Sequence, residues 1–328
     1  MKVSVPDAAV ADPIRLSRRR KWLMLGGITF ICLAVVALAG LTTAGFLSPQ
    51  NLQVILRAAA LVGIVAVGMA FVTISGTLFA LSVEELAALT AVAFAALMAD
   101  GYGLAARLTL AMLLAGAAGL VQGGIIALGA NPIVTTLGFG AVFRGLASVV
   151  SGNRNVRLGD TSADSIGTGR PLGMPTQSWA FLAVVIVAVI VLRHIRFGRV
   201  MTLTGANPAT AMAAGLNVGM AAIAAITLVS LAAGVAGIFA AAQFAQAKPD
   251  LFRGFNIQVV AAVLVGGVAI TGGRESPLQA AMGAVFNATL TNFMLIRGYP
   301  TGVRILVVGL IAAFAVCLFQ ILNRERRS

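Results

Sequence analysis

Charge is scarce in this sequence: 10% of its 328 residues are Asp, Glu, Lys or Arg, while 59% are hydrophobic. Soluble globular domains carry about 25% charged residues, so a soluble chain of this composition would lack the polar surface that covers a core. Aromatic residues are also few, at 6%, whereas glycine alone numbers 37. Because small residues let membrane helices approach closely, the composition predicts a tightly packed bundle of helices in a membrane.

Reactive side chains are equally sparse. His194 is the only histidine, and the only cysteines, Cys32 and Cys317, lie within apolar runs, which excludes a disulfide framework and a CxxC metal pair. None of the three lysines is followed by Ser or Thr, as the phosphate-binding pattern GxxxxGK[ST] requires. We therefore expect no catalytic residues, no metal and no cofactor bound by this chain.

Acidic residues are few and mostly fall in tails or loops; only Glu84 and Glu85 stand where an apolar segment begins. Ion-driven carriers usually bury acids or histidines within their spans, so we expect a separate partner to supply the energy for this chain. The two glutamates could face a solute or a partner arginine, or could occupy the first turn of a helix, where the dipole favours acids. An ion-coupled carrier or channel that depends on them stays open as an alternative.

Apolar segments of the length that crosses a membrane, about 17–25 residues, recur along the chain. They predict an all-α polytopic membrane protein of about ten transmembrane helices: 22–42, 52–74, 82–99, 104–129, 131–150, 179–195, 219–242, 256–271, 277–296 and 302–322. The first segment is as long as a true span, so we interpret it as a helix rather than a cleaved signal.

The ends of the chain are basic. A polar tail, 1–21, precedes the membrane domain at 22–322, and a short tail, 323–328, follows it. An even number of spans and basic clusters beside the first and last predict that both termini are cytoplasmic. The cytoplasmic excess is modest, because the expected outer loops also carry basic residues: Arg154, Arg157, Arg170, Lys248, Arg253 and Arg297.

Two hydrophilic stretches interrupt the spans. Residues 151–178, rich in Gly, Ser, Thr and Pro, predict an irregular external loop. Residues 198–218 predict a cytoplasmic loop with a short helix that contains the Ala-rich run 209–214; Asn207 would cap it, Pro208 would be its first residue and Gly215 would end it. The alternative for this second stretch is an ordinary turn between spans.

The chain also contains a weak candidate for an internal sequence repeat. Residues 68–97 and 264–290 each have an apolar run, Ile-Ser-Gly or Ile-Thr-Gly, a polar break and an Ala-rich run. Transporters are often built from such repeats, with broken helices at the repeat interface. Chance similarity between two Ala/Gly-rich helices is an equal alternative.

Several motifs occur in an order typical of one family. They are the stretches FLSPQNL at 46–52, GIVAVGMAFVTISG at 63–76, NPIVTTLG at 131–138 with FRGL at 143–146, GR at 198–199 with GAN at 205–207 and AMAAG at 211–215, AAVLVGG at 261–267, and TGGRES at 271–276. From about residue 48 to 316 the chain resembles the permease subunits of ribose-type ABC importers.

The resemblance implies a multi-pass permease of the bacterial inner membrane for a small polar solute, most simply a monosaccharide. Nucleosides, polyols or furanone-like signals are alternative solutes. It implies three partners: a cytoplasmic ATPase that holds ATP and Mg²⁺, a periplasmic solute-binding protein, and a second copy or a sister permease. We expect no nucleic acid as a partner, because the positive charge collects beside apolar segments. The residues that it assigns to ATPase coupling are Arg199, Gly205, Asn207, Ala211 and Gly215.

A translocation pathway is expected near the predicted helix breaks. Uncharged hydrogen-bonding groups there suit a hydroxylated solute, although Ser and Thr also bond their own helix backbone. The predicted pathway residues are Ser75, Gly76, Ser82, Glu84, Asn256, Gln258, Gly266 and Gly267. Arg144 lies within a span, where a charge is costly: it could line the pathway or pair with an acid, or it could extend to the outer interface.

The chain departs from the family pattern where that pattern is charged. Ala80 stands where the family carries Asp before Leu-Ser, and Asn256 and Gln258 replace an acidic pair. Ala209 and Met212 replace Glu and Arg in the coupling segment. These losses fit either the divergent half of a heterodimer or ordinary drift within a homodimer.

Overall fold

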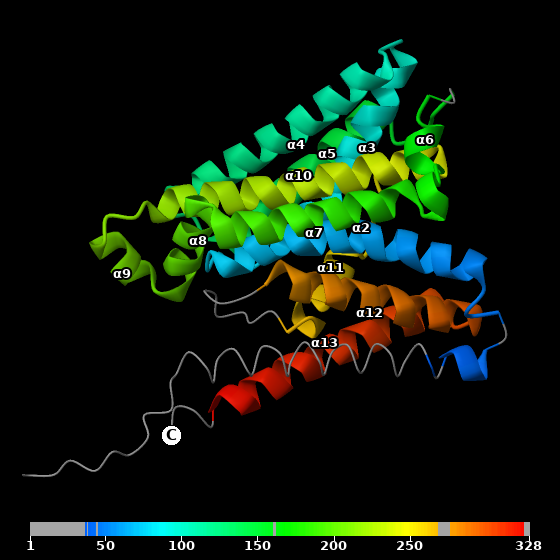
Figure 1. Cartoon of the computed structure of the whole chain (residues 1–328). Helices are drawn as coiled ribbons and strands as arrows, with labels where there is room; N and C mark the ends of the chain where they lie inside the picture. Colours follow the sequence, from blue (N-terminus) through cyan, green and yellow to red (C-terminus); the bar gives the residue numbers. More distant parts are fainter. Residues whose placement is uncertain (1–36, 38, 44, 160–161, 268–275, 325–328) are drawn as a thin grey trace, which may run out of the picture.

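The chain folds into a bundle of long helices (Figure 1). The computed structural model describes residues 37, 39–43, 45–159, 162–267 and 276–324. The long helices are α2 (Pro49–Ile74), α3 (Val83–Ala99), α4 (Leu104–Ala127), α5 (Pro132–Ser151), α7 (Thr176–His194), α10 (Val218–Phe244), α12 (Pro277–Ile296) and α13 (Thr301–Arg324). The shorter elements are β1 (Val156–Arg157), α6 (Asp164–Gly167), the 3-10 helix η1 (Pro171–Gly173), α8 (Arg196–Ala206), α9 (Pro208–Ala213), β2 (Gln246–Ala247) and α11 (Phe255–Val265). The predicted all-α class is confirmed.

Most of the predicted spans are found as helices. Five of them, α2, α4, α5, α7 and α10, are long and apolar enough to cross a membrane, and α3, α12 and α13 coincide with three further predictions. The predicted span 22–42 lies outside the described residues except for its helical end at 37 and 39–42.

The predicted span 256–271 needs correction, because α11 ends at Val265. Its 11 residues reach about 16 Å at 1.5 Å per residue, roughly half of the hydrocarbon thickness. Residues 266–267 form a turn, and 268–271 lie outside the described part. Within the described chain, α11 is therefore a half-span helix, although the apolar run continues past its end.

The core lies where α10 packs against α2, α3 and α4. Glycines bring α4 against α10: a Cβ atom added at Gly119 or at Gly123 would lie 2.7 Å from the Cα atom of Thr227 or Ile223. Close backbone approach of this kind holds membrane helices together through van der Waals contact. This tightly packed centre includes Ala80, which lies in the non-helical segment between α2 and α3.

Four dipeptides of Ser or Asn followed by Pro each begin a helix. Ser48 precedes α2, Asn131 precedes α5, Asn207 precedes α9 and Ser276 precedes α12, and each side-chain oxygen accepts a backbone N–H of the first turn. Proline suits the next position because its missing N–H would be unpaired there in any case. Helix capping thus explains why Ser-Pro and Asn-Pro dipeptides occur at these positions of the sequence.

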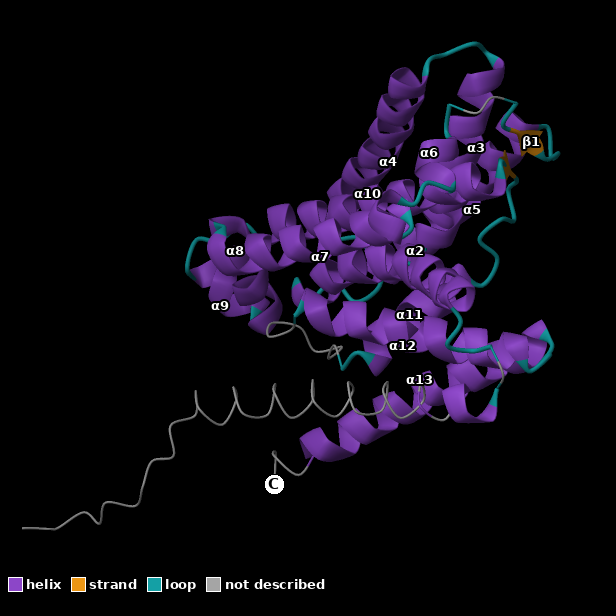
Figure 2. Cartoon of the chain, turned by 45° about the vertical axis from the view of Figure 1, so that its right-hand side comes forward, coloured by secondary structure: helices purple, strands orange, loops and turns teal. Residues whose placement is uncertain are grey.

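The two hydrophilic stretches lie at opposite ends of the bundle (Figures 1 and 2). At one end, β1 pairs antiparallel with β2, near α6; we call this the β1–β2 end. At the other, the α8–α9 end, two short helices join α7 to α10, and α13 also ends on this side. Between α5 and α7 the described residues form only short elements, in keeping with the irregular loop that was predicted over 151–178.

Candidate functional site

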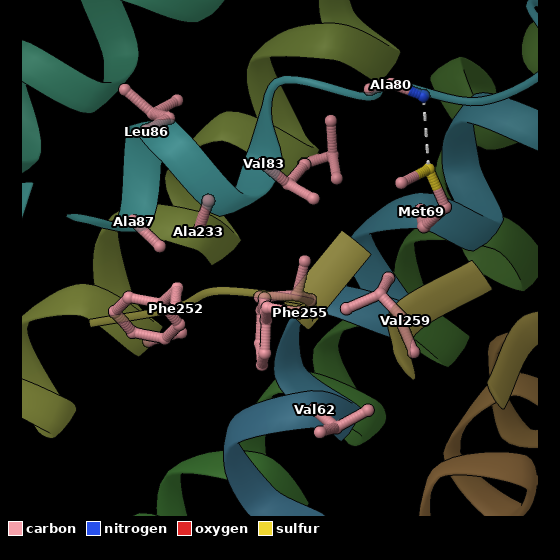
Figure 3. Close-up of a cluster of buried hydrophobic side chains, with 14 of the residues drawn as sticks. Val62, Met69, Ala80, Val83, Leu86, Ala87, Ala233, Phe252, Phe255 and Val259 are labelled. Atoms are coloured by element: carbon pink, nitrogen blue, oxygen red, sulfur yellow. Dashed lines mark hydrogen bonds between the residues drawn. The ribbon is translucent and has the colours of Figure 1, made fainter. Parts of the chain in front are cut away.

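The chain breaks sharply after α2. The Ser75 hydroxyl donates to the carbonyl oxygen of Val72 at 2.8 Å, and its oxygen lies 2.9 Å from the Thr77 hydroxyl oxygen. Gly76 has a φ of +80°, a left-handed conformation that glycine adopts without steric cost. Residues 77–82 then run back along α2 without helical structure, and the backbone N–H of Ala80 lies 3.3 Å from the sulfur of Met69 (Figure 3). Gly76, one of the predicted pathway residues, thus lies at the turn where α2 ends.

Asn256 of α11 holds the returning segment in place. Its amide nitrogen donates to the Leu81 carbonyl oxygen at 2.8 Å, and its amide oxygen accepts the backbone N–H of Glu84 at 3.1 Å. The backbone N–H of Asn256 in turn donates to a Glu84 carboxylate oxygen at 3.2 Å. Two predicted pathway residues, 172 positions apart, are thus brought into contact, and their polar groups satisfy backbone that the break leaves exposed.

Two residues that sequence reasoning missed complete this support. The Ser82 hydroxyl donates to the side-chain oxygen of Gln122 on α4 at 2.7 Å, and the Thr136 hydroxyl of α5 accepts the backbone N–H of Leu81 at 3.1 Å. Gln122 and Thr136 are both fully buried. Polar residues in apolar spans were the available signal, because a membrane offers no water to pair with them.

Glu85 lies one residue beyond this network and faces α5. Its Oε2 atom is buried without a hydrogen-bond partner, and a Cβ added at Gly140 would lie 3.3 Å from that atom. Arg144, one turn further along α5, makes no ion pair with Glu85 within the described chain and is exposed. It lines a cavity at the β1–β2 end instead, so of the two expectations for Arg144, extension toward the end of the bundle fits better than pairing with an acid.

Gln258 is the predicted pathway residue that reaches open space. A cavity of about 250 Å³ lies between α2, α10, α11 and α12, and its polar lining includes Gln258, Asn287, Thr291 and Asn292. Gln258 also borders a neighbouring cavity of about 210 Å³. Ser75, Ser82 and Glu84 do not line either cavity. A neutral polar solute could meet amide and hydroxyl groups here.

The two late glycines are used in different ways. Gly267 has a φ of +80° and turns the chain at the end of α11. Gly266 packs against the backbone of α12, where an added Cβ would overlap the carbonyl oxygen of Gln279. Glycine is therefore needed at 266 for the contact between α11 and α12.

The stretch 198–218, which was predicted to couple to an ATPase, contains the short helix that was predicted. Asn207 Oδ1 accepts the backbone N–H of Thr210 at 3.1 Å, proline occupies the first position of α9, and Gly215 follows with a φ of +77°. Ala211 is buried, whereas Arg199 on α8 is exposed. The preceding helix α8 was not predicted as a helix. Its single stripe of buried residues, Gly198, Met201, Thr204 and Gly205, is typical of an amphipathic helix.

Gly205 connects the coupling segment to the break. It packs against the carbonyl oxygen of Ile74, and a Cβ added at Gly76 would lie 3.2 Å from the Gly205 Cα atom. The exposed α8–α9 end therefore touches the point at which α2 stops and the chain turns back. A displacement of α8 would be transmitted directly to residues 74–76.

Comparison with known proteins gives consistent relatives. The family described as "Branched-chain amino acid transport system / permease component" matches residues 51–316. The chain is 31% identical to the L-arabinose ABC transporter permease protein AraH of Azospirillum brasilense over 98% of this chain and 95% of that protein. It is 30% identical to the ribose import permease protein RbsC of Escherichia coli K12, over 90% and 94%, and 28% identical to the L-arabinose transport system permease protein AraH of the same organism, over 94% of each.

No solved structure matches the chain. The family match covers more than half of the sequence, and the relatives are aligned over nearly their whole length. The resemblance inferred from the motifs is thereby confirmed. The chain belongs to this family of ABC-transporter permease components, together with its ribose and arabinose permease relatives.

Proposed function

We propose that this chain is the membrane-spanning subunit of an ABC importer that moves a monosaccharide across the cell membrane. A separate ATPase docks at α8 and α9, and a solute-binding protein delivers the sugar at the β1–β2 end. The chain itself binds no nucleotide. The names of the relatives, a ribose and two arabinose permeases, support a sugar as the solute.

One observation carries the coupling mechanism: Gly205 of α8 packs against the end of α2. Helices that move as rigid bodies can transmit closure of an ATPase to a distant break. Because contact is direct here, motion of the exposed end would alter the turn at Gly76 without an intervening loop. The same contact would let a solute near the break influence the ATPase.

The basic clusters beside the first and last predicted spans, together with basic residues at the α8–α9 end, support one orientation. Arg193, Arg196 and Arg199 gather at the α8–α9 end, where they are exposed. Basic residues beside spans favour the cytoplasm, which puts the ATPase and α8–α9 on the same side. Both termini would then be cytoplasmic, with residues 151–178 outside.

Pairing with a second permease, identical or related, is supported by α5. Its exposed face carries Gly138, Ala141 and Gly145 beside Arg144. Small residues permit close helix contact in membranes, and a charge on a lipid-facing surface is costly. A partner permease covering this face would exclude lipid from Arg144.

The test is reconstitution. Proteoliposomes that contain this chain, its ATPase and its binding protein should accumulate sugar only when ATP is supplied on the side of the membrane where the ATPase is bound. Vesicles with this chain alone should not accumulate sugar on a proton or sodium gradient. The buried, unpaired Oε2 atom of Glu85 favours ion coupling as a second candidate; gradient-driven uptake that is lost in Glu85→Gln would establish it and reject the ATP-driven mechanism.

A further inference from the structure

A basic cavity opens at the β1–β2 end of the bundle. It has a volume of about 330 Å³, and its charged and hydroxyl-bearing lining consists of Arg144, Ser148, Arg154, Lys248, Asp250 and Arg253, with two asparagines between them. We call this cavity the basic basin. It is separate from the cavity that Gln258 lines between α2 and α12, although Arg253 borders both.

The short sheet assembles the basin from distant parts of the chain. Val156 pairs with Ala247 and Arg157 pairs with Gln246 in an antiparallel register. Residues just before β1 are thereby set beside residues just after β2, which brings Arg154 and Lys248 to one site. The last two turns of α5 add Arg144 and Ser148.

The positive charge of the basin is only partly compensated. Four cationic side chains face one carboxylate, which leaves a formal charge of +3. Asp250 lies 3.6 Å from the Lys248 ammonium and 3.5 Å from the Arg253 guanidinium, and these partners are solvent-exposed, so the pairs are weak. Arg144 and Arg154 form no ion pair within the described chain.

The location makes this charge costly. In the proposed orientation the basin is on the outer side of the membrane. Basic residues favour cytoplasmic loops, so four of them on the outer side act against this orientation. Arg144 also stands in the span α5, where a charge is expensive unless it faces a partner or water. A binding role for these groups would account for their convergence on one cavity.

We propose that the basic basin binds the carboxylate of a sugar acid and so makes this permease selective for an anionic sugar. Guanidinium groups recognise carboxylates through paired, charge-assisted hydrogen bonds, and rings of Arg and Lys select anions in pores. Ser148 and the two asparagines, Asn153 and Asn155, offer polar groups to sugar hydroxyls. The proposal rests on the proposed sugar-import function and narrows its substrate class.

The experiment compares matched ligands on the full-length chain in nanodiscs of zwitterionic lipid. D-gluconate is measured against sorbitol, and D-galacturonate against D-galactose, by titration calorimetry at two salt concentrations. We expect each acid to bind at least about tenfold more tightly than its neutral counterpart, with an advantage that shrinks at high salt. Equal binding within both pairs overturns the proposal.

Variants assign the effect to the basin. Arg144→Gln with Arg154→Gln should weaken acid binding about tenfold or more, while Arg144→Lys with Arg154→Lys should lose less because it keeps the charge. Arg157→Gln is the matched control: it removes an exposed arginine from the same end, outside the basin, and should change binding less than about twofold. Equal losses in the control and the double variant contradict the assignment, and the lysine variant keeps the test valid if the glutamine variant misfolds.

A parallel assay separates this proposal from the proposed function. Basal and binding-protein-stimulated ATP hydrolysis are measured with the complete complex. Variants that lose stimulation by the binding protein but bind both acids normally would show that the basin docks an acidic protein surface, which overturns the sugar-acid site. A chain that binds acids selectively but never couples to an ATPase would keep the basin and reject the proposed function.

Discussion

Gly205 of α8 packs directly against the main-chain carbonyl oxygen of Ile74, the last residue of α2. This contact joins an exposed, basic end of the bundle to the break at Gly76. Because backbone meets backbone, even a methyl group has no room between the two helices. The contact can therefore be altered by the smallest possible substitution.

Gly205→Ala should separate α8 from the end of α2. Forcing a methyl group into this contact costs about 1–3 kcal/mol of stability, and we expect sugar-stimulated ATP hydrolysis by the complex to fall more than basal hydrolysis does. Gly124→Ala is the control, because a Cβ at this helical glycine meets open space. Loss of stimulation in both variants, or in neither, would contradict direct coupling through Gly205.

Local features of this fold could be predicted from the sequence. Apolar length located the long helices, and the Asn207-Pro208 step predicted the short helix α9, because a capping side chain and a preset proline φ act within one turn. A turn at Gly76 could be expected from the sequence, since glycine adopts a positive φ without steric cost.

Features that depend on distant contacts could not be predicted. The end of α11 at Val265 is invisible in an apolar run that continues to 271, because composition does not reveal where a neighbouring helix replaces lipid. Gln122 and Thr136 were missed since their partners, Ser82 and Leu81, are 40 and 55 residues away. Glu84 and Asn256 were both predicted as site residues, but their contact spans 172 positions, and no local pattern encodes it.

The Asn256–Glu84 contact predicts an electrostatic rescue. Asn256→Asp would put a second carboxylate beside Glu84 and remove the donor to the Leu81 carbonyl oxygen. We expect a loss of about 2–4 kcal/mol in the free energy of unfolding, measured by thermal unfolding in detergent.

Adding Glu84→Gln to Asn256→Asp removes one of the two charges and should restore part of that loss. Glu84→Gln alone is the control and should cost about 1 kcal/mol, because its amide oxygen can still accept from the backbone of residue 256. Strict additivity of the two single changes would argue against direct contact between these side chains.

The Ser82–Gln122 bond predicts a second form of rescue. Ser82→Ala removes the donor to a fully buried amide oxygen, which should destabilise the protein by about 1–3 kcal/mol. Replacing both partners, with Ser82→Ala and Gln122→Leu, should recover part of this loss because no polar atom is then left unpaired. A double variant less stable than both single variants would show that the bond is not the main role of these residues.

Loss of the Asn207 cap should destabilise α9 without changing the stability of the membrane-spanning helices. Asn207→Ala removes the oxygen that accepts the Thr210 N–H and should destabilise α9 by about 1 kcal/mol, which frays an exposed six-residue helix without disturbing the buried spans. We expect weaker capture of the ATPase in pull-down and an unchanged thermal unfolding temperature. Asn207→Ser retains a capping oxygen and should restore capture to near the original level. If the alanine variant captures ATPase as well as the original chain does, the ATPase docks somewhere other than α9.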